Sequence, residues 1–368
     1  MDLAAEMLAR RLRAEHADRF ETAHLCPPFK RRATWLPLVG AHRYPSTFDR
    51  LVNRLRDYPR YAGDVRHQFD VFHVADHSYA ALVHALPAER TGVFCHDLDA
   101  FRAALDPRGH PRPRWYRALA RHVLRGMQRA AVVFHATLAV RRQIEALGLI
   151  DPSKLVHAPL AAADEFVPHD HNGDVPRAPR VVRAAREPFL LHVGSCARRK
   201  RIDVLLDAFA HARRARPELR LVKVGGAWSD AQLEQIGRLG VDAHVVHLCA
   251  LDRASLAWLY RRAALVLFPS EAEGFGLPVI EALACGAPVL ASDIAVLREV
   301  GGDAATYAPV GDVGAWAAAV ARHLGDPSAA PSRATRLARA STFSWSTHAA
   351  TIAAAYERIA VSLHPARP

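Results

Sequence analysis

Cysteine is scarce and scattered in this chain of 368 residues. Its five cysteines are an odd number and form no Cys-x-x-Cys pair, which excludes a disulfide framework and a zinc site of that type. The longest stretch without Asp, Glu, Lys or Arg covers 340–356 and is rich in Ser, Thr and His, so no segment could cross a bilayer as a helix. The opening MDLAAEMLARRLRAEH lacks the apolar core of a secretion signal. We therefore expect free thiols and a cytoplasmic location.

Lysine is also rare, because only four of the 49 Lys and Arg residues are lysines. Against 37 acidic residues the chain carries a formal net charge of +12, which favours anionic partners such as phosphates, nucleotides or an anionic membrane surface. An excess of Arg with abundant Ala is also typical of a GC-rich genome, so the charge alone does not choose among these partners. The 51% apolar content excludes a mainly disordered chain. The length suggests about two domains.

Short apolar runs alternate with longer amphipathic segments, which is typical of βαβ units with parallel strands. The pattern predicts two doubly wound α/β domains facing a cleft, with ligands at the carboxyl ends of the strands. The first half is expected to form strands at 71–74, 93–95, 131–134 and 154–157, and helices at 2–13, 115–129 and 139–147. The second half is expected to form strands at 189–193, 220–224, 245–248, 265–268 and 287–291, and helices at 202–215, 229–239, 253–263, 277–284, 313–323 and 346–361.

The segment 169–188 is rich in Pro, Arg and Asp and has little periodicity, so we expect an interdomain linker there. The predicted divisions are a first domain over 1–168, a second over 189–340, and a last helix in 341–368 that packs back toward the first domain. A doubly wound domain ordinarily opens with a strand, but Met1 already stands at the start of a predicted helix. Either the chain begins upstream of Met1 or the first domain lacks its usual first strand.

The most informative stretch covers 268–292, FPSEAEGFGLPVIEALACGAPVLAS. A predicted strand runs into a Gly-Phe-Gly loop and then into a helix whose N-terminus favours an anion. Glu273 lies in the loop and Glu281 lies eight positions on in the helix, so both can point into one cleft. Carboxylates suit hydroxyl-rich ligands because they accept hydrogen bonds from sugar hydroxyl groups. From these residues alone, a solvated Glu pair on an ordinary strand-to-helix loop remains the alternative.

The sequence EGFGLPVIEA resembles the E-x7-E signature of the GT-B glycosyltransferases of family 4, the retaining group that uses nucleotide-diphosphate sugars. The stretches LHVGSCARRKRIDVLLDAFAHA and ALDRASLAWLYRRAALVLFPS, which precede the signature, are similar to the same family. So are VLREVGGDAATYAPVGDVGAWAAAVARHL and FSWSTHAATIAAAYERI, which follow it. The resemblance covers 189–359 almost continuously. It implies a GT-B fold of two Rossmann-like domains and leans toward a mannosyltransferase-like subgroup.

The resemblance also implies roles for the matching residues. Glu273 would contact the donor sugar, Glu281 would hold the ribose hydroxyls, and Lys200 with Arg199 would clamp the diphosphate. Ser195 stands where many members carry Arg. The phosphate-binding role would therefore fall to Arg199 and Lys200, and Ser195 would contribute only a minor hydrogen bond. The catalytic candidates are His96, Glu273, Lys200 and Arg199. The donor-binding candidates are Gly194, Ser195, Glu273, Gly274, Phe275, Gly276, Leu277, Glu281, and His247, Cys249 and Leu251 at the border of the base pocket.

The first half carries a looser match. The sequence TGVFCHDLDA ends a predicted buried strand in His96 and Asp97, and it resembles the family's His-Asp pair, whose histidine contributes to the reacting centre. The sequence VFHVADHSYA resembles another motif of the same subgroup. These matches imply Asp76, His77 and Asp97 as acceptor-side residues. From the residues alone, a hydrogen-bonded packing role for His96 remains the alternative.

The resemblance implies transfer of a hexose, with GDP-mannose as the expected donor, to a glycan or lipid-linked acceptor. No metal or other cofactor is expected, because Arg199, Lys200 and the helix N-terminus would neutralise the diphosphate. The cluster His169-Asp170-His171 lacks a third spaced ligand and is not expected to bind metal. The mechanism that the family implies is front-face displacement, in which the leaving phosphate helps to deprotonate the acceptor.

Arginines recur every three or four positions over 114–129, so a helix there would carry one basic stripe beside Trp115 and Tyr116. Such a helix suits peripheral contact with an anionic membrane, and an ordinary solvated helix is the alternative. No nucleic-acid partner is expected, because no aromatic stacking motif or base-reading helix is present. The other hypotheses are a phosphorylase or epimerase on the same scaffold, a silent nucleotide-sugar-binding protein, and a basic nucleic-acid-binding protein.

Overall fold

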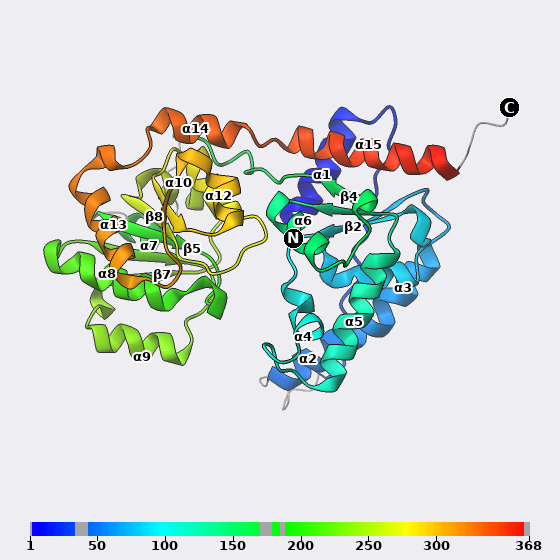
Figure 1. Ribbon diagram of the computed structural model, residues 1–368, viewed down its shortest axis with the longest axis horizontal. Helices are drawn as coiled ribbons and strands as arrows, with labels where there is room; N and C mark the ends of the chain where they lie inside the picture. The colour runs from blue at the N-terminus through cyan, green and yellow to red at the C-terminus, as the bar shows by residue number, and fades with distance from the viewer. Residues whose placement is uncertain (1, 34–42, 170–178, 185–187, 364–368) are drawn as a thin grey trace. The chain divides into compact units, whose positions relative to one another are not determined.

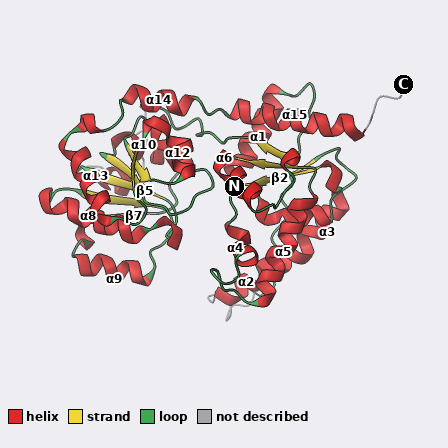
Figure 2. Cartoon of the chain, in the orientation of Figure 1, coloured by secondary structure: helices red, strands yellow, loops and turns green. Residues whose placement is uncertain are grey.

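The computed structural model describes residues 2–33, 43–169, 179–184 and 188–363, and it divides into two compact units (Figure 1). Unit 1 comprises Met1–Pro159 and Trp345–Pro368, and unit 2 comprises Leu160–Ser344. Each unit is built around its own parallel sheet, with helices packed against it (Figure 2). The predicted doubly wound α/β class is therefore confirmed. No helix in the described ranges combines the length and apolarity needed to cross a membrane.

The sheet of unit 1 contains four parallel strands in the order β1-β2-β3-β4. All five residues of β2 and all four of β3 are buried, as expected for central strands covered on both faces. The strands are β1 (Phe72–Val74), β2 (Thr91–Cys95), β3 (Val132–His135) and β4 (Leu155–His157). The helices are α1 (Asp2–Glu15), α2 (Arg43–Val52), α3 (Tyr58–Val65), α4 (Arg102–Leu105), α5 (Arg114–Arg129), α6 (Leu138–Ala146) and α15 (Trp345–Leu363).

The last helix, α15, belongs to unit 1 and packs on α1. The Tyr356 hydroxyl donates a hydrogen bond to the Phe72 carbonyl at 3.0 Å, which ties α15 to β1. His348 lies 3.2 Å from the carbonyl oxygen of Ala158, just after β4. The chain therefore returns to its first sheet after completing the second.

The sheet of unit 2 contains six parallel strands in the order β10-β9-β8-β5-β6-β7. The order reverses between β5 and β8, and at such a switch point the loops after the two strands diverge and leave room for a ligand. The strands are β5 (Phe189–Val193), β6 (Arg220–Val224), β7 (Val245–Leu248), β8 (Leu265–Phe268), β9 (Val289–Ser292) and β10 (Thr306–Ala308). The helices are α7 (Pro179–Ala184), α8 (Ile202–Ala215), α9 (Asp230–Leu239), α10 (Arg253–Arg262), α11 (Leu277–Ala284), α12 (Ala295–Gly301), α13 (Val313–Gly325) and α14 (Arg333–Ser341).

Helices α8 and α13 cover one face of this sheet, where Phe209 and Trp316 are fully buried against Leu190 and its neighbours. Local signals place the ends of several helices. Ser229 and Gln232 form a reciprocal capping box at the start of α9, and Gly240 ends that helix in the left-handed conformation. The predicted periodicity and the observed elements therefore agree most closely in unit 2.

Several elements differ from the sequence-based expectation. Helix α7 lies inside the segment predicted as a linker, most of which falls outside the described residues. Six elements were not predicted, and each spans ten residues or fewer, which gives a periodic pattern little length in which to stand out: α2, α3, α4, α12, α14 and β10. In the described part of unit 1, α1 comes before every strand of the sheet.

Candidate functional site

The centre of unit 2 contains two glycine turns that pack directly against each other at the carboxyl ends of β5 and β6. The main-chain N–H of Gly194 donates to the Val224 carbonyl at 2.9 Å, and that of Gly225 donates to the Leu248 carbonyl at 2.9 Å. Gly225 has a φ of +111°, and a Cβ atom there would lie 2.4 Å from the Gly194 carbonyl oxygen. Only glycine fits this approach, which brings the two turns close enough to form one surface beside the switch point.

A basic turn follows Gly194 and leads into α8. Arg199 and Lys200 lie in the 3₁₀ turn Arg198–Lys200, and Arg201 enters the helix with a left-handed φ of 45°. The Lys200 side chain is 11% exposed and its ammonium contacts one oxygen of Glu273. Arg199 Nη1 donates to the other oxygen, Oε2, at 3.0 Å and to the Ala272 carbonyl at 2.8 Å. The structure thus brings together three residues that stand 73 and 74 positions apart in the sequence.

Glu273 is held charged by these two cations. Burial alone would raise the pKa of its carboxyl, but the neighbouring Lys200 ammonium and the Arg199 guanidinium hold the pKa below its ordinary value. Its side chain is only 9% exposed. A carboxylate shared by two cations marks a position whose electrostatics favour an anion.

The loop after β8 ends at Gly276, whose φ of +91° turns the chain into α11. Phe275 is buried and packs edge-on against Phe343, with ring centroids 5.6 Å apart. Leu277 is the first residue of α11 and is half-buried. This packing anchors the loop that carries Glu273 and Gly274 at the switch point.

Glu281 lies one turn into α11 and is 8% exposed. Its Oε2 accepts a hydrogen bond from the Tyr260 hydroxyl of α10 at 3.1 Å. Burial raises the pKa of Glu281 to about 7, although the Tyr260 hydrogen bond acts in the opposite direction. The two signature glutamates therefore differ chemically, since Glu273 is firmly ionised and Glu281 titrates near neutral pH.

The residues expected at the base pocket lie beside the second glycine turn. His247 Nε2 donates to the carbonyls of Gly225 at 2.8 Å and Gly226 at 3.1 Å. Cys249 is exposed, and its carbonyl accepts a hydrogen bond from Arg180 at 3.2 Å. Leu251 is half-buried. Ser195 is exposed, and its hydroxyl lies 3.5 Å from the main-chain nitrogen of Ala197 within its own turn.

Two buried polar residues near this surface were missed in the sequence analysis. His192 and Lys223 are both fully buried and are register partners on β5 and β6, and Lys223 is in turn the partner of His247 on β7. His192 Nδ1 donates to the Leu267 carbonyl at 2.9 Å, and burial lowers its pKa to about 4. The Lys223 ammonium donates to the Gly226 carbonyl and lies 5.2 Å from the Trp228 ring centroid. Polar residues inside the apolar runs FLLHV and RLVKV were the available signal.

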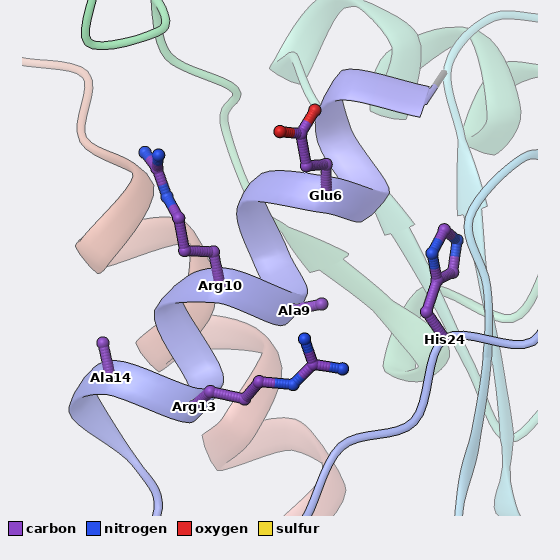
Figure 3. Close-up of a pocket in the computed structure, with 6 residues that line it drawn as sticks. All are labelled: Glu6, Ala9, Arg10, Arg13, Ala14 and His24. Atoms are coloured by element: carbon purple, nitrogen blue, oxygen red, sulfur yellow. The ribbon is translucent and has the colours of Figure 1, made fainter.

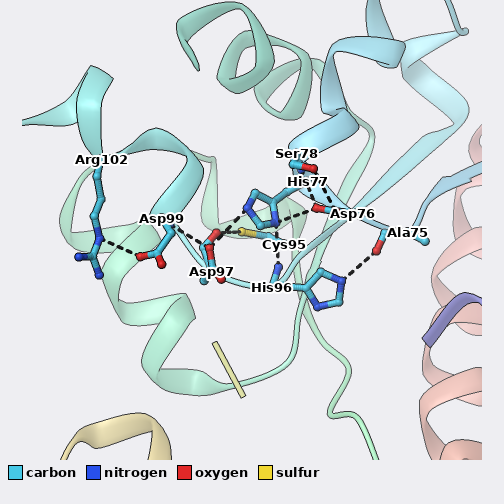
Figure 4. Close-up of polar contacts among 9 residues, drawn as sticks. All are labelled: Ala75, Asp76, His77, Ser78, Cys95, His96, Asp97, Asp99 and Arg102. Atoms are coloured by element: carbon cyan, nitrogen blue, oxygen red, sulfur yellow. Dashed lines mark hydrogen bonds and ion pairs between the residues drawn. The ribbon is translucent and has the colours of Figure 1, made fainter. Parts of the chain in front are cut away.

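In unit 1 the loops after β1 and β2 bring together the four residues singled out there (Figure 4). His96 Nε2 lies 3.0 Å from the Ala75 carbonyl, and the main-chain N–H of His96 donates to His77 Nδ1 at 3.2 Å. His77 Nε2 lies 3.6 Å from Asp97 Oδ1, and its Nδ1 lies 3.5 Å from Asp76 Oδ1. Burial lowers the pKa of both histidines. Both rings are therefore neutral at neutral pH.

A hollow of about 450 Å³ on α1 of unit 1 contains none of these candidates (Figure 3). Arg10 and Arg13 project from α1, and His24 comes from the segment that follows it (Figure 3). Arg13 also donates to the Thr22 carbonyl at 3.0 Å. Within the described ranges, no three or more His, Cys, Asp and Glu side chains are grouped so that they could hold a metal ion.

The comparisons with known proteins bear directly on the surface built by β5, β6 and β8. Residues 177–341 match the family described as Glycosyl transferases group 1. O-antigen chain mannosyltransferase B of Escherichia coli is 30% identical over 262 residues, which cover 70% of this chain and 67% of that protein. The chain belongs to the glycosyl transferases group 1 family. It is a glycosyltransferase by descent, as the sequence predicted.

Other matches agree with this family. D-inositol 3-phosphate glycosyltransferase of Mycobacterium avium (strain 104) is 34% identical over 234 residues, which cover 59% of this chain and 52% of that protein. The chain therefore spans two thirds of the Escherichia coli relative and about half of the mycobacterial one.

Solved glycosyltransferases share the fold. Sucrose-phosphate synthase from Thermosynechococcus elongatus aligns with a TM-score of 0.72 at 21% identity, over 98% of this chain and 93% of that one. Anabaena HepE in complex with UDP aligns with a TM-score of 0.65 at 20% identity, over 84% of each chain. These neighbours are GT-B glycosyltransferases, so the predicted GT-B class is confirmed.

Proposed function

We propose that this glycosyltransferase is a retaining hexosyltransferase and that its unit 2 binds a nucleoside-diphosphate sugar. The observation that carries the proposal is the Glu273 carboxylate held between Arg199 and Lys200. Two cations beside a glycine turn suit the diphosphate of a donor, because charge-assisted hydrogen bonds to phosphate oxygens are strong and directional. The neighbouring N-terminus of α11 adds its favourable dipole.

The chemistry follows from where charge develops. As the glycosidic bond breaks, negative charge gathers on the leaving diphosphate, and Arg199 and Lys200 stabilise it. Loss of one such preorganised donor typically costs about 3–4 kcal/mol of barrier. Glu273, released from the two cations when the diphosphate replaces it, faces the sugar, and Glu281 accepts hydrogen bonds from the ribose hydroxyls. We propose that these cations suffice without a metal ion.

For the donor we propose GDP-mannose, supported by the similarity to a mannosyltransferase of Escherichia coli. The structural neighbour HepE was solved with UDP, which makes UDP-glucose the natural comparison in any assay. Retention would follow from front-face displacement, in which a leaving phosphate oxygen accepts the proton of the acceptor hydroxyl. In unit 1, His96 and Asp97 at the end of β2 would serve the reacting centre and the acceptor.

For the acceptor we propose a glycan, carried on a lipid, at the cytoplasmic face of a membrane. The support is helix α5, which contains no acidic residue. Its buried side includes Val123 and Met127, whereas Arg121 and Arg125 are exposed and Trp115 is 56% exposed. A basic face with an exposed aromatic residue suits an anionic lipid surface.

The proposal is tested by measuring thermal unfolding with GDP, UDP, ADP and dTDP, each with and without EDTA. A ligand present at 100 times its Kd adds about 2.7 kcal/mol to the free energy of unfolding, which moves the melting temperature by a few degrees. One nucleotide should raise the melting temperature equally in both conditions, and the matching sugar nucleotide should then yield the free nucleoside diphosphate. A protein that responds to none of the four, or that forms sugar phosphate from inorganic phosphate without nucleotide, would refute the proposal.

A further inference from the structure

The His77 imidazole links the two loops that follow β1 and β2 in unit 1 (Figure 4). Its side chain is 6% exposed, and the ring lies 5.5 Å from the Phe101 ring, centroid to centroid. Nδ1 accepts the main-chain N–H of His96 at 3.2 Å, and Nε2 faces Asp97 Oδ1 at 3.6 Å. The ring is therefore placed to hold other parts of the protein.

These contacts decide the tautomer of His77. A main-chain N–H can only donate, so Nδ1 must present a lone pair to His96. The neutral ring then carries its proton on Nε2, on the side of Asp97. A doubly protonated ring would have no acceptor left for the His96 N–H.

His96 is consequently fixed at two points by the segment that follows β1. Its main-chain nitrogen is held by His77, and its Nε2 donates to the Ala75 carbonyl at 3.0 Å. Because a carbonyl oxygen only accepts, the neutral His96 ring keeps its proton on Nε2 and presents Nδ1 as a lone pair. Both the position of the ring and the identity of its accepting nitrogen thus depend on the loop that carries His77.

We propose that His77 is a positioning residue for the transfer reaction, which fixes the main chain of His96 through Nδ1. This inference rests on the proposed function, in which His96 acts at the reacting centre. A misplacement of about 1 Å at a reacting group can cost about a hundredfold in rate, so a single main-chain hydrogen bond is sufficient to matter.

The proposal carries a pH dependence. The charged groups facing His77 are Asp76 on its own loop, Asp97 and Asp99 after β2, and Arg54 from the preceding helical segment. Burial is the largest influence and lowers the pKa of His77, against the three carboxylates. On acidification Nδ1 gains a proton, turns from the His96 N–H to Asp76 Oδ1 at 3.5 Å, and releases His96. Activity should therefore fall toward acid pH as His77 is protonated.

The test compares His77→Asn, whose amide oxygen replaces the Nδ1 acceptor, with His77→Phe, which has no acceptor. Ser78→Ala is the matched control, since it removes a 3.0 Å hydrogen bond to Asp76 from the same turn without touching His96. The readout is release of GDP from GDP-mannose and of UDP from UDP-glucose, as a function of pH. We expect His77→Phe to lower kcat about tenfold or more with little change in donor KM, while His77→Asn and Ser78→Ala stay near the wild type. In His77→Asn the part of the acid limb that belongs to His77 should disappear, leaving only the fall that comes from protonation of His96.

A double-mutant comparison separates positioning from a merely structural role. If His77 acts through His96, adding His77→Phe to His96→Ala should cause no further loss. If the two losses are additive, the positioning role of His77 is overturned. The same holds if His77→Phe keeps its full kcat while His96→Ala is inactive. Both outcomes leave the proposed part of His96 intact. Full activity of His96→Ala would overturn this inference together with the proposed part of His96.

A spectroscopic measurement tests the tautomer of His77 without requiring any enzymatic activity. Nitrogen-15 spectra of the histidine side chains in the ligand-free protein, assigned by comparison with His77→Asn, should show Nδ1 of His77 unprotonated at pH 7.5. A protonated Nδ1 overturns the inference even if neither sugar nucleotide is turned over, so its failure is distinguishable from that of the proposed function.

Discussion

Replacement of Glu281 by Gln should stabilise the ligand-free protein at pH 8 while weakening its binding of nucleotide. The carboxyl lies in α11 with 8% exposure and accepts a hydrogen bond from Tyr260. Burial raises its pKa from 4.5 to about 7, so the charged form is disfavoured in the folded state. The side chain is isosteric in the Gln variant and still offers an oxygen to Tyr260.

The magnitude follows from linkage. The difference between a pKa of 4.5 in the unfolded chain and about 7 in the folded one corresponds to about 3 kcal/mol. Because the carboxyl of Glu281 has the higher pKa in the folded protein, its protonation stabilises the fold. This stabilisation is fully present below pH 4.5 and is lost as pH rises through about 7. Glu281→Gln should therefore raise the free energy of unfolding by up to about 3 kcal/mol at pH 8 and change it little near pH 4.5.

Nucleotide binding should reverse this preference. If ribose hydroxyls donate to Glu281, the carboxylate is favoured in the complex and the pKa falls. Near pH 7 binding should release about half a proton, and near pH 9 almost none. Calorimetric titration with GDP or UDP in two buffers of different ionisation enthalpy measures the released protons directly. Near pH 7 the Gln variant should release about half a proton fewer than the wild type, because only the terminal phosphate of the nucleotide still loses a proton, and it should bind more weakly.

Glu271→Gln is the matched control, because this carboxyl is exposed and lies in the loop that precedes α11. It should leave both the stability profile and the proton release unchanged. A Glu281→Gln protein that is no more stable at pH 8 than the wild type would contradict the burial argument. Equal proton release by the two proteins would contradict the ribose contact.

The remaining predictions concern the diphosphate clamp and helix α5. Glu273→Gln should bind free GDP or UDP about tenfold more tightly, since the diphosphate no longer displaces a carboxylate from Arg199 and Lys200, but it should lose transfer activity. Weaker binding in titration calorimetry would argue against this displacement. Lys200→Ala should lower kcat a hundredfold or more while changing nucleotide affinity less, and full turnover would remove Lys200 from the mechanism. Arg121→Glu with Arg125→Glu should abolish sedimentation with vesicles that contain anionic lipid but leave GDP and UDP binding intact; unchanged sedimentation would favour an ordinary solvated helix.

Much of unit 2 follows from local sequence. The apolar runs that become β5, β6, β7 and β8 coincide with the predicted strands, because buried parallel strands are short, continuous and bounded by polar turns. The loop with Glu273 was also evident, since glycine and proline at a strand-to-helix junction restrict the backbone locally. By contrast, α7 and β10 depend on neighbours far along the chain, and no periodicity in six or three residues reveals them. The preference for GDP-mannose stays a prediction, as does transfer without a metal.

The sequence by itself determined the fold class, the family and which carboxylates and cations to examine, because period, turn residues and motif spacing are local properties of the chain. Only the tertiary structure decided how those groups are charged and paired. It joined Glu273 to Arg199 and Lys200 across 74 positions, buried Glu281 against Tyr260, and turned His77 toward the main chain of His96. These properties depend on desolvation and on distances between strands that meet only after folding, so no local pattern encodes them.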